Sequence, residues 1–211
     1  MNIKKSVLQN RSIIQTVIMV IMTSLMATGC VTIQRKPIAV DVNAFERGIE
    51  PIMIMPIVDV RADKSVSFDK DDSDKLRSLV IKRLQGLGYS AQSCDSWKSS
   101  VSPQQLSDMN EKELCRLLPP NAKSAMIISV DGLRDSYKVL VTSFSISATF
   151  TVIDISGQKE IWKDAAVGEH GGGGVLDAAV AQIGKRSGAY NALVDTVFPS
   201  FPKKSSIPGA R

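Results

Sequence analysis

Residues 137–155 carry the pattern that most constrains the fold, an alternation of apolar and polar side chains. In the stretch "FSISATFT", Phe144, Ile146, Ala148 and Phe150 alternate with serines and threonines. A period of two is typical of a β-strand with one face on a core. The turn "SGQ" at 156–158, where Gly157 is expected to take a positive φ, predicts an antiparallel return over 159–167. The apolar face of this hairpin has to be covered by another layer.

The first half of the chain predicts a strand–helix–strand unit. Residues 51–60, "PIMIMPIVDV", are apolar at nearly every position, as in a strand buried on both faces. Pro56 lacks an N–H and is expected at a bulge or an unpaired point. Apolar residues at helical spacing predict a helix over 72–87, and "YSAQSC" predicts a short strand parallel to the first.

The remaining segments complete the pattern. Short helices are expected over 102–109 and 111–118, a strand over 124–133 and a last helix over about 175–197. The sequence therefore predicts an α+β fold, in which a mixed sheet has a strand–helix–strand first half and an antiparallel meander in its second half, with helices packed on it.

The amino terminus indicates export and lipid attachment. A basic start precedes an apolar run of about 15 residues, shorter than the roughly 20 of a membrane span and typical of a secretory signal peptide. The run ends in "LMATGC", which resembles the lipobox of bacterial lipoproteins, with Ala27 where leucine is commonest. This resemblance implies cleavage before Cys30 and lipidation of its thiol with acyl chains such as palmitate. A plain signal peptide, or a short anchor with an incidental cysteine, is the alternative.

Cleavage at this point organises the chain into four parts. They are a signal peptide over 1–29, a tether over 30–50, a single α+β periplasmic domain over 51–198 and a disordered tail over 199–211. The residue after Cys30 is Val31 rather than the aspartate of inner-membrane retention signals, so the resemblance favours the periplasmic face of the outer membrane.

Removal of the signal peptide also changes the charge. The whole chain has a formal net charge of +5, but residues 1–29 contain three cations and no acid, which leaves +2. The mature chain has no basic cluster, so we expect no nucleic-acid partner. Its two remaining cysteines, Cys94 and Cys115, lie in an oxidising compartment, where a disulfide and two buried thiols are both open interpretations.

The chain's single histidine, His170, limits the chemistry that these residues can support. A zinc site needs three or four convergent ligands, and Glu169, adjacent on a strand, points to the opposite face. The sequence has no G-x-S-x-G serine motif. We therefore expect no catalytic residue, no metal and no cofactor, and we place His170 at a solvated strand end.

Two further features are candidate ligand sites. Asp59, Arg61, Asp63 and Lys64 follow the first predicted strand, where α/β sheets often bind ligands, but a solvated charged turn is the simpler interpretation. The run "GGGG" at 171–174 lacks the Lys-Ser or Lys-Thr pair of a phosphate-binding loop. We expect no nucleotide there, and we interpret the glycines as a flexible connection between the last strand and the last helix.

Several segments together resemble a known family. They are "DVNAFERGIEPIMIMPIVDVRADKS", "GLGY", "SAMIISVDGLRDSYKVLVTSFSISATFTVIDISGQKEIW" and a glycine run before an alanine-rich helix. Their order over residues 40–198 resembles a family of Gram-negative outer-membrane lipoproteins, often encoded beside CsgG-type lipoproteins. The resemblance implies a fold similar to the amino-terminal domain of TolB and the periplasmic domain of CsgG, with a hairpin marked by Asp154, Gly157 and Trp162, and no known catalytic residues. A weaker likeness is to small lipoproteins of the YajG type.

Two classes of function follow. The first is a lipid-anchored envelope module without catalytic activity, which binds another envelope protein, such as a CsgG-like lipoprotein in a secretion complex. The alternative is a protein that binds, or an enzyme that acts on, a small ligand or a glycan at the outer membrane.

Overall fold

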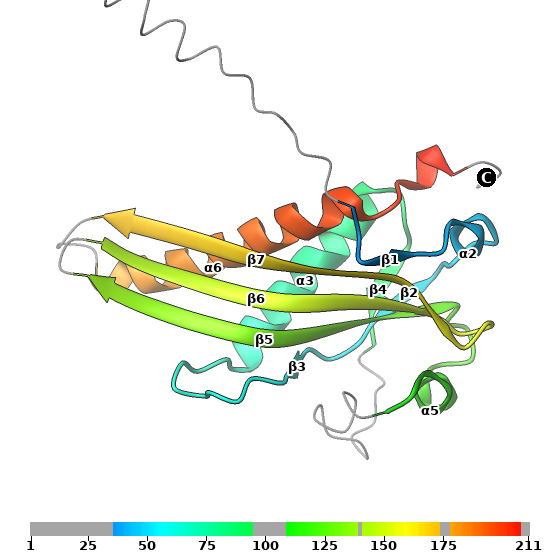
Figure 1. The fold of residues 1–211 in the computed structure, drawn as a ribbon, viewed down its shortest axis with the longest axis horizontal. Coiled ribbons are helices and arrows are strands. Elements are labelled where there is room, and N and C mark those ends of the chain that lie inside the picture. The colour runs from blue at the N-terminus through cyan, green and yellow to red at the C-terminus, as the bar shows by residue number, and fades with distance from the viewer. Residues whose placement is uncertain (1–35, 95–108, 139–140, 174–177, 208–211) are drawn as a thin grey trace, which may run out of the picture. The chain divides into compact units, whose positions relative to one another are not determined.

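The computed structural model describes residues 36–94, 109–138, 141–173 and 178–207. Among these residues a seven-stranded sheet has the order β1–β7–β6–β5–β2–β4, and β3 also pairs with β5 (Figure 1). The strands are β1 Ala39–Val40, β2 Ile52–Ile54, β3 Val58–Asp59, β4 Ala91–Ser93, β5 Ser124–Lys138, β6 Val141–Asp154 and β7 Lys159–Gly173. The helices are α2 Val42–Glu46, α3 Lys70–Gly86, α5 Glu111–Leu117 and α6 Ala178–Val197, followed by 3-10 turns at Phe198–Ser200 and Lys204–Ser206. The predicted α+β fold with a mixed sheet is confirmed. The predicted signal peptide, Cys30 and the helix expected over 102–109 lie outside the described residues.

Parallel and antiparallel pairing meet at β5. Strands β5, β6 and β7 form a long antiparallel meander, with Ala148 of β6 between Val130 of β5 and Ala166 of β7. On its other side β5 pairs in parallel with β2, which pairs in parallel with β4. The strand–helix–strand unit expected in the first half is therefore β2–α3–β4.

Pro56 divides the strand that was expected over 51–60 into β2 and β3. On either side of it, the Met55 N–H donates to the Met126 carbonyl at 3.0 Å and the Val60 N–H donates to the Val130 carbonyl at 3.0 Å. Pro56 has no N–H with which to continue this ladder. Its expected place at an irregular point of the strand is confirmed.

Helix α3 begins at a side-chain cap. The Asp69 carboxylate accepts the Asp72 N–H at 2.9 Å, and Asp71 and Asp72 place negative charge in the first turn, where it complements the helix dipole. Three residues at helical spacing, Leu76, Val80 and Leu84, are fully buried. The helix extends two residues further toward the amino terminus than the expected Asp72.

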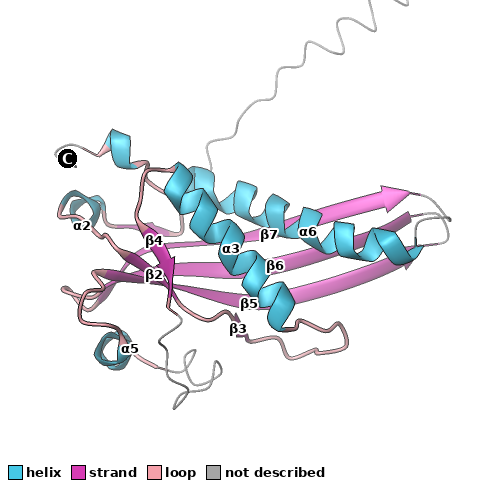
Figure 2. Ribbon diagram, turned by 180° about the vertical axis from the view of Figure 1, so that it is seen from behind, coloured by secondary structure: helices cyan, strands magenta, loops and turns pink. Residues whose placement is uncertain are grey.

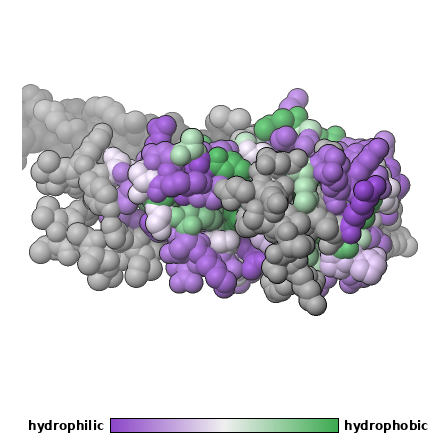
Figure 3. Space-filling view, turned by 90° about the horizontal axis from the view of Figure 1, so that it is seen from below, coloured by the Kyte–Doolittle hydropathy of each residue, from purple (hydrophilic) through white to green (hydrophobic). Residues whose placement is uncertain are grey.

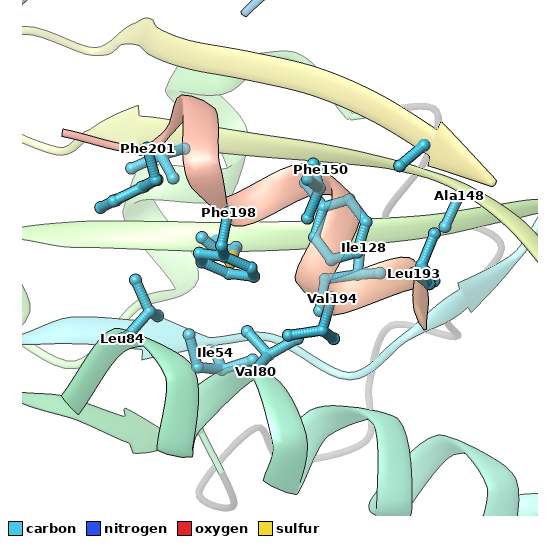
Figure 4. Packing of buried hydrophobic residues seen from close by; sticks show 14 of the residues in the cluster. Ile54, Val80, Leu84, Ile128, Ala148, Phe150, Leu193, Val194, Phe198 and Phe201 are labelled. Atoms are coloured by element: carbon cyan, nitrogen blue, oxygen red, sulfur yellow. The ribbon is translucent and has the colours of Figure 1, made fainter. Parts of the chain in front are cut away.

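Helices α3 and α6 lie on the same face of the sheet (Figure 2). The apolar residues of β6 point toward them, and the core continues into a group of aromatic rings (Figure 4). The Trp162 and Phe201 ring centroids are 4.9 Å apart, and Phe150 packs edge-on against Phe198 at 6.1 Å. This is the covering layer that the alternation in β6 required.

Among the described residues, the opposite face of the sheet is covered at only one end. There a second apolar cluster brings together Met53, Met55, Val58, Cys94, Leu118, Ala122, Ala125 and Ile153. Strand β2 is thus buried on both faces, as predicted. Met53 points into this second cluster, whereas Ile52 and Ile54 point into the main core. Cys94 is buried, and Cys115 of α5 packs partly buried against the same cluster. Both cysteines thus belong to this end of the sheet, and the disulfide between them stays a prediction.

The predicted tether ends earlier than residue 50. Strand β1 and helix α2 lie within the range 30–50, and Phe45 is buried against Tyr89 and Phe201. Pairing of β1 with the start of β7 brings this segment to the sheet, since Val40 is opposite Trp162. The domain therefore includes residues from at least Ala39, because burial of Phe45 and Ile49 holds them there.

The segment after residue 198 was expected to be a disordered tail, and through Ile207 this is wrong. Phe201 is 2% exposed and Ile207 is 8% exposed. The Lys204 N–H donates to the Leu87 carbonyl at 3.2 Å, and the Tyr89 hydroxyl donates to the Pro202 carbonyl at 3.0 Å. Burial of the apolar residues Phe201 and Ile207 holds this Pro- and Lys-rich segment against the domain.

Two expectations about glycine are also corrected. Gly171, Gly172 and Gly173 are strand residues of β7, opposite Ser143, Thr142 and Val141 of β6, and not a flexible connection. Only Gly174 lies outside the described part of the run. In the β6–β7 turn, Gln158 takes the positive φ of 49° that was expected of Gly157.

Candidate functional site

The part of the sheet that neither helices nor the second cluster cover is the candidate site, and Figure 1 looks onto it. We call this surface the open face. Its residues are partly or fully exposed and mostly small or polar: Ser129, Asp131, Gly132, Arg134 and Ser136 of β5; Ser143, Ser145, Ser147 and Thr149 of β6; Ala165, Val167, Glu169 and Gly171 of β7. The pairing places Arg134, Ser145 and Glu169 in one row across the three strands. The open face is therefore a hydroxyl-rich surface with charges of both signs.

A bulge in β5 brings Asp131 onto this face. The pairing with β6 shifts between Val130 and Gly132, so two successive residues point outward. The Asp131 carboxylate accepts hydrogen bonds from the Ser147 hydroxyl and, at 3.2 Å, from the Thr149 hydroxyl. A Cβ on Gly132 would collide with the Ser147 hydroxyl, so glycine leaves room for this contact.

A shallow recess of about 330 Å³ lies beside this bulge. It is lined by Asp131, Gly132, Arg134, Ser145, Ser147 and Val167. Hydroxyls, one carboxylate and one guanidinium can exchange hydrogen bonds with a polar partner surface or with a polyhydroxyl ligand.

Hydrogen bonds and ion pairs within the charged turn after β3 hold its side chains together. Arg61, 6% exposed, donates to the Asp59 carboxylate through Nε at 2.7 Å and Nη2 at 2.8 Å, and to the Val66 carbonyl through Nη1 at 2.8 Å. Lys64 contacts the same carboxylate at 2.8 Å. Partial burial raises the pKa of Asp59, but the bonds from Arg61 and Lys64 outweigh it and lower this pKa to about 2. Residues 62–65 of the turn are exposed, as expected of a solvated charged turn, and Arg61 is the residue that is buried. Figure 3 shows mostly hydrophilic residues on the described surface seen from below, with small hydrophobic patches between them.

A second, partly buried ion pair joins α3 to α6. Arg186 donates to the Asp72 carboxylate and, at 3.1 Å, to the Ser67 carbonyl, and its guanidinium lies 5.2 Å from the Phe144 ring centroid. Asp72 is 3% exposed. Burial, together with the nearby Asp72 carboxylate, raises the pKa of Tyr190 far above its usual value, so its phenol stays neutral. The aspartate and arginine at this point stabilise the helix pair.

The hairpin residues of the family resemblance are also structural. The Asp154 carboxylate accepts the Ser156 N–H at 3.1 Å and the Ser156 hydroxyl at 2.8 Å, and it contacts Arg47 at 3.4 Å. A Cβ on Gly157 would come within 2.9 Å of that carboxylate. Trp162 is fully buried in the core. Beside Asp154, a recess of about 360 Å³ is lined in part by Arg47 and Lys123.

His170 and Glu169 are both exposed near the carboxyl end of β7. The His170 ring lies against Gly188 of α6, where a Cβ would collide with it. Within the described part of the chain, no three His, Cys, Asp or Glu side chains are grouped closely enough to hold a metal ion. The same part of the chain has no helix with the length and apolar character needed to cross a membrane.

Sequence reasoning found the outward serines of β6 but did not identify the open face. Asp131, Arg134 and Glu169 join those serines only through the pairing of β5 and β7 with β6. The polar half of the alternation in β6 was the signal available for this surface. Because β6 lies in the middle of the meander, each of its faces continues onto both neighbouring strands.

No protein-family model matches the chain, and no curated protein matches its sequence. Among solved structures, lipoprotein GNA1162 from Neisseria meningitidis is 17% identical with a TM-score of 0.47, over 63% of this chain and 96% of that chain. The PelC dodecamer from Paraburkholderia phytofirmans is 16% identical with a TM-score of 0.47, over 79% of this chain and 92% of that chain. The LpoB C-terminal domain from Salmonella enterica is 10% identical with a TM-score of 0.36, over 55% of this chain and 80% of that chain.

Proposed function

We propose that the chain is a lipoprotein of the cell envelope that acts as a non-catalytic interaction or assembly module. In this proposal Cys30 anchors it to the outer membrane, the domain stands in the periplasm, and the open face binds another envelope protein. A CsgG-like lipoprotein is the partner that the family resemblance implies. The observation that carries the proposal is the open face itself, a broad polar surface on three long strands whose other side is filled by the core.

The use of the charged side chains supports a binding role over a catalytic one. Asp59 with Arg61 and Asp72 with Arg186 are engaged in structural ion pairs. On the open face, Asp131 already accepts two hydroxyl hydrogen bonds. These contacts hold the surface in one shape, which suits recognition of a partner with a complementary shape.

A photo-crosslinking amino acid at Ser145, in the middle of the open face, tests this proposal in cells. The matched control is the same amino acid at Lys82, an exposed position on α3. We expect one defined envelope protein to be captured from Ser145 and not from Lys82. Capture of the same proteins from both positions, or of none from Ser145, would contradict the proposal.

The recess beside Asp131 favours one second candidate, binding of a small polyhydroxyl ligand or glycan. Carboxylate, guanidinium and hydroxyl groups converge on a volume of about 330 Å³. A ligand that binds the folded state raises the melting temperature by mass action. A glycan fragment that does so in the native chain, and not in an Arg134→Ala variant, would favour this function over protein binding.

A further inference from the structure

Three exposed apolar side chains occur within five residues, at the point where the described part of the chain begins. Ile38 is 64% exposed, Val40 44% and Val42 51%, at alternate positions in and around strand β1. Among the described residues, the other exposed large apolar side chains are Val60 and Val167, each on a different segment. We call the group Ile38, Val40 and Val42 the apolar ridge. Single exposed apolar residues are ordinary, whereas grouped ones indicate a contact surface.

Val40, in the middle of the ridge, lies on the opposite side of the sheet from the open face. It is paired with Trp162 of β7, and residues directly opposite each other in an antiparallel pair point to the same face. The Trp162 ring is fully buried and packs against Phe201 in the main core, which is on the helix-covered side. A surface that covers Val40 therefore leaves the open face free to bind its partner.

The ridge begins eight residues after Cys30, the predicted site of lipid attachment. An extended chain spans at most about 3.6 Å per residue, so Ile38 is no more than about 29 Å from the anchored cysteine. A compact domain of this length is about 40 Å across. A tether of this length cannot place the far side of the domain on the membrane, and it raises the effective concentration of the ridge at the lipid surface.

The charged groups next to the ridge are compatible with a lipid surface. Lys36 is exposed two residues before Ile38, where its ammonium can reach lipid phosphates. The Asp41 carboxylate is paired with Lys159, so its charge is offset. Glu46 of α2 is exposed, and the exposed cation Lys36 balances it. Apolar side chains in a segment without excess negative charge fit the boundary between headgroups and acyl chains.

We propose that the apolar ridge rests in the interface of the membrane that holds the lipid anchor. The occupant of the ridge is thus the lipid surface, and the acyl chains on Cys30 and the ridge together orient the domain. This inference rests on the proposed function, since it needs the anchor at Cys30. It adds that the open face has a fixed direction relative to the membrane, away from the side that Val40 occupies.

Lipid contact at Val40 is measured in the full lipidated chain, reconstituted into vesicles of phosphatidylethanolamine and phosphatidylglycerol. A fluorescent amino acid at Val40 reports quenching by lipids that carry bromine on their acyl chains. The matched control is the same amino acid at Val60, which is 42% exposed and follows β3, across the long strands from β1 (Figure 1). We expect at least about threefold more quenching at position 40 than at position 60, because only the ridge enters the interface.

A second pair of variants separates the ridge from the short tether. Ile38→Asn combined with Val42→Asn removes the apolar side chains on either side of the probe at position 40 and leaves the tether unchanged. Val167→Asn removes an exposed valine of the open face and is the control. We expect the first change to lower quenching at position 40 to the level at position 60, and the second to leave it unaltered. All three sites are exposed, so both variants keep the fold, which circular dichroism checks.

Equal quenching at positions 40 and 60 would overturn the inference. Quenching at position 40 that persists in Ile38→Asn with Val42→Asn would also overturn it, because the tether alone would then explain the contact. In either case, capture of a partner from Ser145 would leave the proposed function standing. Strong quenching at position 40 without capture from Ser145 would count against the open-face partner alone. A chain that does not float with the vesicles would contradict the anchor and the inference together.

Discussion

Gly168 of β7 lies against the backbone of Ala189 in α6. A Cβ on Gly168 would collide with the Ala189 carbonyl oxygen and would come within 2.7 Å of the Leu193 Cβ. Ala189 and Leu193 are fully buried, so neither can turn away into solvent. The absence of a side chain at position 168 sets the spacing between the strand and the helix that covers it.

Gly168→Ala is therefore expected to lower the free energy of unfolding by about 3 kcal/mol, the upper end of the cost of overpacking a core, because backbone must move. Gly188→Ala is the matched control. The atoms nearest to its Cβ would be those of the His170 ring, an exposed side chain that can turn toward solvent, so we expect a loss below about 1 kcal/mol. Urea unfolding followed by circular dichroism measures both. Equal small losses would show that α6 does not pack on β7 in this way.

Asp59→Asn should make stability less dependent on acid pH. The pKa of Asp59 is lowered from 3.8 to about 2, so its carboxylate contributes stability above about pH 4 that is lost as the pH falls toward 2. We expect the stability difference between the native chain and Asp59→Asn to shrink by about 2 kcal/mol over this range. In an Arg61→Met background most of this pH dependence should disappear, because the main hydrogen-bond donor to the carboxylate is gone. An unchanged pH dependence would contradict the role given to Arg61.

Phe201→Ala should destabilise the domain although it lies beyond the last long helix. Its ring packs 5.4 Å from Phe45, 5.4 Å from Tyr89 and 4.9 Å from Trp162, between centroids. Loss of a buried phenylalanine costs about 3–5 kcal/mol. Lys203→Ala, at an exposed neighbouring position, should change the free energy of unfolding by less than about 0.5 kcal/mol. A similarly small effect for both variants would contradict the packing of Phe201 and would favour a disordered tail.

Cys30→Ala should abolish incorporation of labelled palmitate into the chain and leave the precursor uncleaved. The expectation follows from the lipobox-like "LMATGC", in which the cysteine thiol is the group to be acylated. A Cys94→Ala variant controls for acylation elsewhere and should label like the native chain. Palmitate labelling that persists in Cys30→Ala would overturn lipid anchoring.

Local patterns in the sequence predicted much of the fold. The alternation around Phe150 identified β6 and its buried face, and the leucine stripe of α3 identified its helix within two residues. The predictions that β2 is buried on both faces and that Pro56 lies at an irregular point of the strand were also confirmed. Each of these depends on hydrogen bonding or side-chain periodicity within a few residues, so each is visible without knowledge of neighbours.

The tertiary structure decided what depends on partners far away in the chain. Glycines have a low intrinsic preference for strands, yet Gly171, Gly172 and Gly173 extend β7 because β6 supplies their ladder. Phe45 and Phe201 join the core from segments that look like a tether and a tail, because each completes the aromatic group around Trp162. The open face exists only where three strands align Asp131, Arg134 and Glu169 with the serines of β6. Periodicity says which way a side chain points, whereas the neighbours it meets are set by strand pairing, which no local pattern encodes.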